Sequence, residues 1–119
     1  LYGLKIKMFE DGKNPCGDGM VNFFSYIKEE LNNLPIEKFI IALRGEGLEV
    51  RRVGNAPLHL LPYFYKSKGN KKLKKAEVFH NSTISFPTFT FENMNIIDLY
   101  IKAIKKVCMY YHKKNKYKV

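Results

Sequence analysis

The chain has 119 residues and a mass of 13.9 kDa, which is enough for one hydrophobic core but not for two. We expect one domain over residues 1–113 and a basic tail over residues 114–119. No apolar run reaches the roughly 18 residues of a membrane-spanning helix, so we expect no membrane partner. The chain begins with Leu1 and lacks a charged-then-apolar leader, which suggests that it was shortened, either deliberately or by removal of a targeting segment.

The positive charge is confined to the second half of the chain. Residues 1–65 carry eight basic and eight acidic side chains, whereas residues 66–119 carry 13 lysines and three acids, which accounts for the whole net charge of +10. Lysine binds phosphate as a point charge, so the excess favours contact with a nucleic-acid backbone over reading of bases. A solubilising surface in a lysine-rich proteome is the alternative interpretation, but such segregation within one small domain favours a polyanionic partner.

The first part of the chain predicts a strand, a loop and a helix. Residues 4–9 alternate with a period of two, which is typical of a half-buried strand, and residues 10–19 are rich in loop-forming residues. Asp18 is a candidate N-cap for a helix over residues 20–31. One face of that helix would carry its apolar side chains: Met20, Phe23, Phe24, Ile27 and Leu31.

A second strand is expected at residues 38–43, whose apolar run suits the centre of a covered sheet. Strand, helix and strand within about forty residues make a βαβ unit, so the two strands should be parallel. Residues 45–55 contain two adjacent arginines, Arg51 and Arg52, and form either a short extra hairpin or a loop.

The middle of the chain predicts a β-hairpin. In residues 58–65, side chains alternate between two faces as in a strand, and Pro62 lacks the backbone N–H that would pair with a neighbouring strand. Residues 77–84 supply the returning strand, which ends at Ser85. Between them, residues 67–75 form a polar turn that is rich in lysine.

The last predicted element is a helix with a basic outer face. Asn95 and Asp98 resemble a capping box at its start. The apolar stripe comprises Ile96, Ile97, Tyr100, Ile101, Ile104, Val107, Cys108 and Tyr111. Most of the lysines lie off this stripe: Lys102, Lys105, Lys106, Lys113 and Lys114.

The two cysteines, Cys16 and Cys108, do not form a disulfide framework, and the scattered His59, His80 and His112 lack the spacing of a zinc site. No metal or other cofactor is therefore expected. Dithiol redox chemistry needs a resolving thiol near Cys16, and none is present. A monothiol transferase that uses Cys16 stays open, because a helix N-terminus would lower the pKa of that thiol.

The loop Cys16-Gly17-Asp18-Gly19-Met20 with Phe23 and Phe24 behind it, and the stretch Pro57-Leu58-His59-Leu60-Leu61 leading to Tyr63, point to a family. They resemble the thioredoxin-like family shared by mitochondrial ribosomal proteins and a small accessory subunit of respiratory complex I. The predicted elements follow in β-α-β-β-β-α order, with a parallel pair and an antiparallel hairpin in one four-stranded mixed sheet. This agrees with the resemblance, which implies a thioredoxin-like α/β fold with helices packed on the sheet. The resemblance also implies a cis peptide at Ala56–Pro57. The chain departs from the family pattern at Val21, where the family often has arginine, and at residues 66–75, where a usually short turn is expanded. The expanded turn would fit a ribosomal member that has gained a contact with RNA.

The sequence therefore leads to the expectation of a non-catalytic structural protein of the mitochondrial ribosome, in the mitochondrial matrix, with the large subunit favoured over the small one. Its partners would be ribosomal RNA and neighbouring ribosomal proteins, with no small-molecule substrate. The alternatives are the complex I subunit and the monothiol transferase. The candidate RNA-binding residues are lysines of the turn, the last helix and the tail: Lys66, Lys68, Lys71, Lys72, Lys74, Lys75, Lys105, Lys106, Lys113, Lys114 and Lys116.

Overall fold

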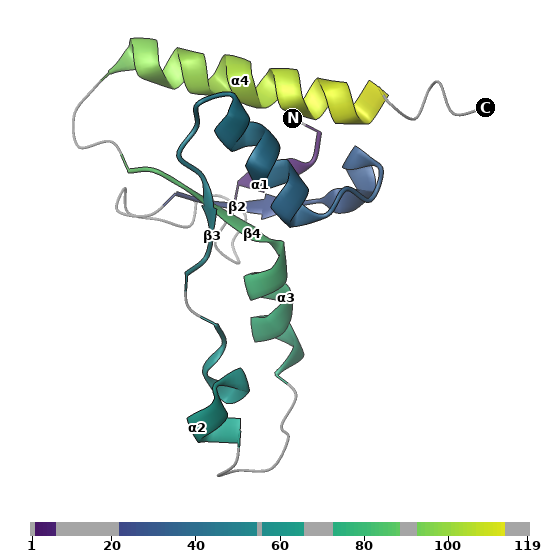
Figure 1. The fold of residues 1–119 in the computed structure, drawn as a ribbon, viewed down its shortest axis with the longest axis vertical. Helices are drawn as coiled ribbons and strands as arrows, with labels where there is room; N and C mark the ends of the chain where they lie inside the picture. Colours follow the sequence, from purple (N-terminus) through teal and green to yellow (C-terminus); the bar gives the residue numbers. More distant parts are fainter. Residues whose placement is uncertain (1, 7–21, 55, 66–72, 89–92, 114–119) are drawn as a thin grey trace.

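The computed structural model describes residues 2–6, 22–54, 56–65, 73–88 and 93–113, which form a four-stranded sheet and several helices (Figure 1). The strands are β1 (Leu4–Ile6), β2 (Asn22–Tyr26), β3 (Arg51–Arg52) and β4 (Thr83–Phe86). The α-helices are α1 (Ile36–Gly45), α2 (Pro62–Tyr65), α3 (Lys74–Ser82) and α4 (Met94–Lys113). Two short 3-10 helices, η1 (Lys28–Leu31) and η2 (Leu58–Leu60), complete this set. The expected combination of helices with a four-stranded sheet is confirmed.

The sheet has the strand order β1-β2-β4-β3, and each neighbouring pair is antiparallel. Phe24 of β2 lies opposite both Ile6 of β1 and Ile84 of β4, which fixes the register at the centre of the sheet. The expected parallel pair is wrong, because the second of its two strands is a helix. The described sheet is therefore antiparallel rather than mixed, and it does not confirm the thioredoxin-like arrangement.

The predicted helix over residues 20–31 is wrong where the structure describes it, since residues 22–26 form β2 and residues 28–31 form η1. Phe24 packs against the core and Tyr26 is buried, so the inward side chains follow a period of two. Aromatic residues also favour strands over helices. The proposed N-cap at Asp18 lies outside the described residues.

The predicted strand over residues 38–43 is also wrong, because this run belongs to α1. Phe39, Ile40 and Leu43 are buried, whereas Ile41 is 66% exposed. That pattern is helical, and a short apolar run does not by itself distinguish a buried strand from a buried helix. Only a two-residue strand, β3, follows at the edge of the sheet.

The predicted β-hairpin is wrong as well. Residues 58–65 form η2 and α2, with Pro62 at the first position of α2, where its missing N–H costs nothing. Residues 77–82 belong to α3, and the strand β4 begins only at Thr83. No cis peptide bond occurs among the described residues, so Ala56–Pro57 is trans and the expected cis bond is wrong.

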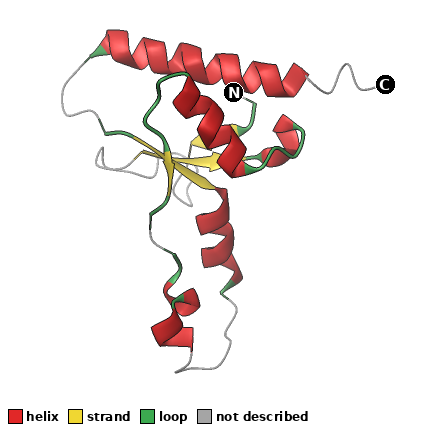
Figure 2. Ribbon diagram, in the orientation of Figure 1, coloured by secondary structure: helices red, strands yellow, loops and turns green. Residues whose placement is uncertain are grey.

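The final helix is confirmed as α4, which packs across α1 and η1 (Figures 1 and 2). Its cap differs from the expected one, because the side-chain oxygen of Asn93 accepts a hydrogen bond from the backbone N–H of Ile96 at 3.2 Å. Val107 and Cys108 are its most buried residues.

The core lies between the sheet, α1, η1 and α4. The ring of Tyr26 stacks on that of Phe39 with centroids 4.9 Å apart, and its hydroxyl donates to the carbonyl of Leu34 at 2.7 Å. Burial is the main cause that raises the pKa of Tyr26 above its ordinary value. Complete burial of a side chain such as Phe39 or Leu43 stabilises the fold by about 1.5–3 kcal/mol.

The structure offers no described helix that is both long and apolar enough to cross a membrane.

Candidate nucleic-acid interface

One face of α4 carries exposed lysines. Lys102, Lys105, Lys106 and Lys113 recur at spacings of three, four and seven or eight residues, so they gather on the side of the helix that faces away from Val107 and Cys108. The only acid on this helix is Asp98, near its N-terminal end. The outer face of α4 therefore presents positive charge to solvent, as the sequence predicts.

Lys106 is the one lysine of this face with an ion pair among the described residues. Its Nζ lies 2.8 Å from the carboxylate of Glu46, which directly follows α1. The side chain of Lys106 is still 68% exposed, so the pair is screened by water and contributes little to stability. Glu46 nevertheless lowers the local positive charge at this end of the face.

A second group of lysines lies at the start of α3. Lys74 and Lys75 are exposed in the first turn, where the free N–H groups of the helix add positive potential. Glu77 follows them, and its carboxylate lies 3.8 Å from Nε2 of His59 in η2. The first turn of α3 is thus in contact with η2.

These two groups do not lie together. Helix α4 crosses one side of the sheet, whereas α3 runs away from the other side and its first turn lies at the far end (Figure 1). The remaining candidates lie outside the described residues: Lys66, Lys68, Lys71, Lys72, Lys114 and Lys116.

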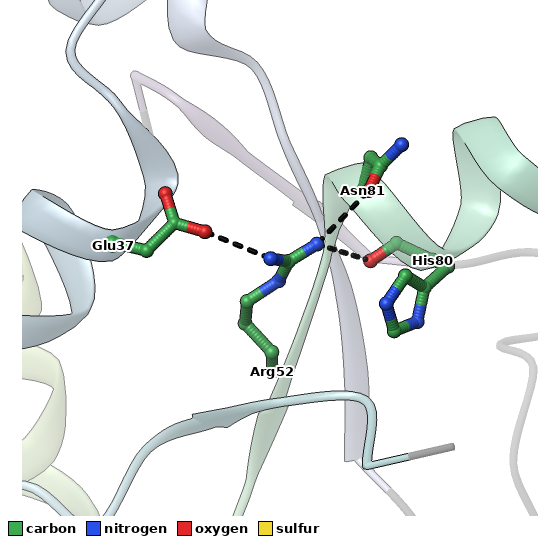
Figure 3. A network of polar contacts seen from close by, with 4 residues as sticks. All are labelled: Glu37, Arg52, His80 and Asn81. Carbon is green, nitrogen blue, oxygen red and sulfur yellow. Dashed lines mark hydrogen bonds and ion pairs between the residues drawn. The ribbon is translucent and has the colours of Figure 1, made fainter. Parts of the chain in front are cut away.

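Arg52 of β3 fixes the base of α3. Its Nη1 donates to Oε1 of Glu37 in α1 at 2.8 Å, and its Nη2 donates to Oδ1 of Asn81 at 3.0 Å and to the carbonyl of His80 at 3.3 Å (Figure 3). The planar guanidinium thus joins three elements through one side chain. This network sets the direction in which α3 leaves the sheet.

Two depressions border α4. One, of about 560 Å³, has Tyr2, Leu4, Lys5, Lys105 and Cys108 in its lining, and the lining is mainly apolar.

The other, of about 410 Å³, lies between the end of α1 and the first half of α4, with Leu48, Leu99, Tyr100, Lys102 and Lys106 in its lining. Lys102 was not among the predicted site residues. Its spacing of three and four residues from Lys105 and Lys106 would have identified it.

The structure describes one of the two cysteines, Cys108. Cys108 is 1% exposed, and burial raises the pKa of its thiol from 9.0 to about 11, so little thiolate forms near neutral pH. Cys16 lies outside the described residues. Within the described part of the chain, no three metal-binding side chains gather at one point.

The chain matches no protein-family model, and a search of curated proteins finds no match for it.

Proposed function

We propose that the chain is a non-catalytic structural protein that binds RNA, and more narrowly a component of the mitochondrial ribosome in the mitochondrial matrix, with the large subunit favoured. Neighbouring ribosomal proteins would be its other partners. The observation that carries the proposal is the charge distribution: residues 66–119 hold the whole net charge of +10, and the described lysines of α4 face solvent.

The physical basis of the proposal is counterion release. Each phosphate that a lysine neutralises frees a condensed cation, so the affinity for RNA falls steeply as salt rises. Because lysine supplies charge without a fixed geometry, the binding would follow the backbone and local shape of the RNA more than its sequence.

The mitochondrial ribosome is proposed because residues 16–20 and 57–61 resemble the thioredoxin-like family that includes mitochondrial ribosomal proteins. The second of these stretches forms η2 rather than a strand, and the first lies outside the described residues. The assignment to the mitochondrial ribosome thus depends on sequence likeness alone. The same is true of the thioredoxin-like fold. RNA binding depends on the lysines alone.

The test is a salt titration of RNA binding with two matched variants. Replacing Lys71, Lys72, Lys74 and Lys75 with Ala should weaken binding to a ribosomal RNA fragment and reduce the slope of log K against log salt by up to about 3. The control removes the same charge from the neutral half of the chain, through Lys5→Ala, Lys28→Ala, Lys38→Ala and Arg51→Ala. An unchanged slope in the first variant, or equal changes in both, would contradict the proposal.

Co-sedimentation tests the narrower part. Recovery of the chain with a mitochondrial ribosomal subunit would support it, and recovery with respiratory complex I would favour the alternative. A glutathione-dependent activity that is lost in Cys16→Ser would point to the transferase instead.

A further inference from the structure

Helix α3, with η2 and α2, forms an arm that projects from the sheet, comprising residues 56–65 and 73–82 (Figure 1). Neither α3 nor η2 contains a buried residue. Several large apolar side chains of the arm are instead exposed: Leu58, Leu60, Tyr63, Phe64, Leu73, Val78 and Phe79. Helices shorter than about 12 residues are marginal in water unless they pack against something. The arm therefore has the composition of a surface that a partner covers.

The arm has a defined direction, because contacts hold its base and its middle. Arg52 binds the C-terminal end of α3, and the ring of Phe79 meets that of Phe23 in β2 edge to face, with centroids 6.0 Å apart. His59 lies against Glu77 at 3.8 Å, which joins η2 to α3. Whatever covers the arm thus meets a preformed surface.

Among the arm residues whose exposure is described, the most exposed large apolar side chain is an aromatic ring. Tyr63 is 82% exposed, and Phe64 beside it is 46% exposed. The two rings meet edge to face at 84° with centroids 5.3 Å apart, and this contact leaves most of the Tyr63 side chain exposed. A flat exposed ring is the platform on which unpaired nucleic-acid bases stack.

The charge of the arm identifies the class of partner. Lys74 and Lys75 are exposed in the first turn of α3, and Glu77 already lies beside His59. The described residues of the arm thus carry two lysines and a single acid, and the sequence has four more lysines and no acid in residues 66–72, between the two parts of the arm. An acid-poor surface that combines lysines with an exposed ring is complementary to a polyanion with planar bases.

We infer that the arm binds unpaired RNA, with a base stacked on Tyr63 and phosphates near Lys74 and Lys75. This inference rests on the proposed function and deepens it. The lysines of α4 would hold any RNA backbone, whereas the arm selects single-stranded segments, because bases within a duplex are stacked on each other.

The experiment compares two labelled RNAs by fluorescence anisotropy: an unstructured 12-nucleotide AC repeat and a hairpin duplex of similar length. The full chain should bind the AC repeat more tightly. Tyr63→Leu keeps an apolar side chain but removes the ring, and it should weaken binding of the AC repeat by about tenfold while leaving the hairpin unaffected. Tyr63→Trp should restore the affinity.

Leu58→Ala is the matched control, since Leu58 lies on the same arm, is 67% exposed and has no ring. It should leave both affinities unchanged. Because Tyr63 and Leu58 are both largely solvated, circular-dichroism melting curves of all variants should match that of the parent chain.

Each other outcome has a distinct meaning. Equal affinity of Tyr63→Leu and the parent chain for the AC repeat would overturn the inference, and retained salt-dependent hairpin binding would leave the proposed function standing. Equal losses in Tyr63→Leu and Leu58→Ala would indicate an apolar surface suited to a protein partner, and would also overturn it. Failure of the parent chain to bind either RNA would refute the proposed function itself.

Discussion

Nη1 of Arg52 lies 2.8 Å from Oε1 of Glu37, and this contact joins the edge strand β3 to the first turn of α1. The same guanidinium reaches Asn81 and the carbonyl of His80 at the end of α3. The side chain of Arg52 is 31% exposed and that of Glu37 is 58% exposed, so the ion pair itself is largely screened. The hydrogen bonds to α3 are therefore the part of this network that holds the arm.

Removing the guanidinium should loosen the arm more than removing its carboxylate partner. Arg52→Ala is expected to lower the free energy of unfolding by about 1–2 kcal/mol, because it leaves the carbonyl of His80 and the amide of Asn81 without this donor. Glu37→Ala should cost about 0.5 kcal/mol or less. Urea titrations measure both changes, and hydrogen exchange in residues 78–82 should rise in Arg52→Ala alone. Equal destabilisation by the two variants would contradict the claim that the hydrogen bonds from Arg52 to α3, rather than its ion pair with Glu37, hold the arm.

Gly3 is expected to tolerate no side chain. Its φ is +82°, and a Cβ on it would lie 2.5 Å from Cδ1 of the fully buried Leu31. Its carbonyl also accepts a hydrogen bond from the N–H of Ile27 at 2.7 Å, so the backbone cannot move away freely. Gly3→Ala should therefore lower the free energy of unfolding by about 2 kcal/mol or more.

Gly47 is the control for Gly3, because a side chain there would meet backbone strain but no steric overlap. Its φ is +91°, but a Cβ there would meet nothing within 4 Å, so Gly47→Ala should cost only about 1 kcal/mol. Gly45, which ends α1, has equally open surroundings, and Gly45→Ala should be neutral or slightly stabilising. Thermal or urea unfolding gives all three values. A cost for Gly3→Ala no larger than that for Gly47→Ala would show that Leu31 moves aside.

The sequence predicts the end of this fold better than its middle. Helix α4 has 20 residues with a stripe that recurs over several turns, so its periodicity is unambiguous. The run at residues 38–43 is too short for periodicity to decide, and only the exposure of Ile41 between buried neighbours shows that it is helical. At residues 20–31, the spacing of the apolar side chains fits a helical stripe, although aromatic residues by type favour a strand. Long-range pairing with β4 selects the strand there, and that pairing is not visible in local sequence.

The candidate site was predicted in part for the same reason. The lysines of α4 follow from helical spacing, and the structure places them on one exposed face. That Lys74 and Lys75 lie far from α4 could not be predicted, because the expected hairpin would have returned the chain to the sheet. The sequence predicts Tyr63 only as one side chain of a strand over residues 58–65. The proposal that it acts as a stacking platform depends on residues 58–65 forming η2 and α2 in the arm rather than a strand of the sheet.

Cys108 should make the fold sensitive to alkali. Burial raises the pKa of its thiol from 9.0 to about 11, so the unfolded chain ionises at a lower pH than the folded one. Its contribution to stability is therefore complete below about pH 9 and is lost as pH rises toward 11. Unfolding titrations from pH 8 to 11 should show falling stability, and Cys108→Ala should reduce that slope. Tyr26, whose pKa is also raised by burial, should cause a further loss that begins near pH 10, where the tyrosine of the unfolded chain ionises, and continues above pH 11.

The same burial makes a prediction for thiol labelling. In a Cys16→Ser chain, an aromatic disulfide reagent at pH 7.5 should react with Cys108 only as fast as the protein opens, because the side chain is 1% exposed. Urea sufficient to unfold the chain should make the reaction immediate. Fast labelling of the native chain would show that the depression beside Tyr2 and Lys105 opens to the thiol.

Glu46 should weaken RNA binding by α4, because its carboxylate lies 2.8 Å from the ammonium of Lys106. Glu46→Gln removes that charge and leaves Lys106 to meet phosphate, so the affinity should rise severalfold at low salt and the salt slope should steepen by less than about 1. Glu37→Gln is the control, since it makes the same charge change at the opposite end of α1. Lys105→Gln should weaken binding, because Lys105 has no acidic partner among the described residues. If Glu46→Gln and Glu37→Gln raise the affinity equally, the effect comes from net charge alone, and the outer face of α4 is not where the RNA lies.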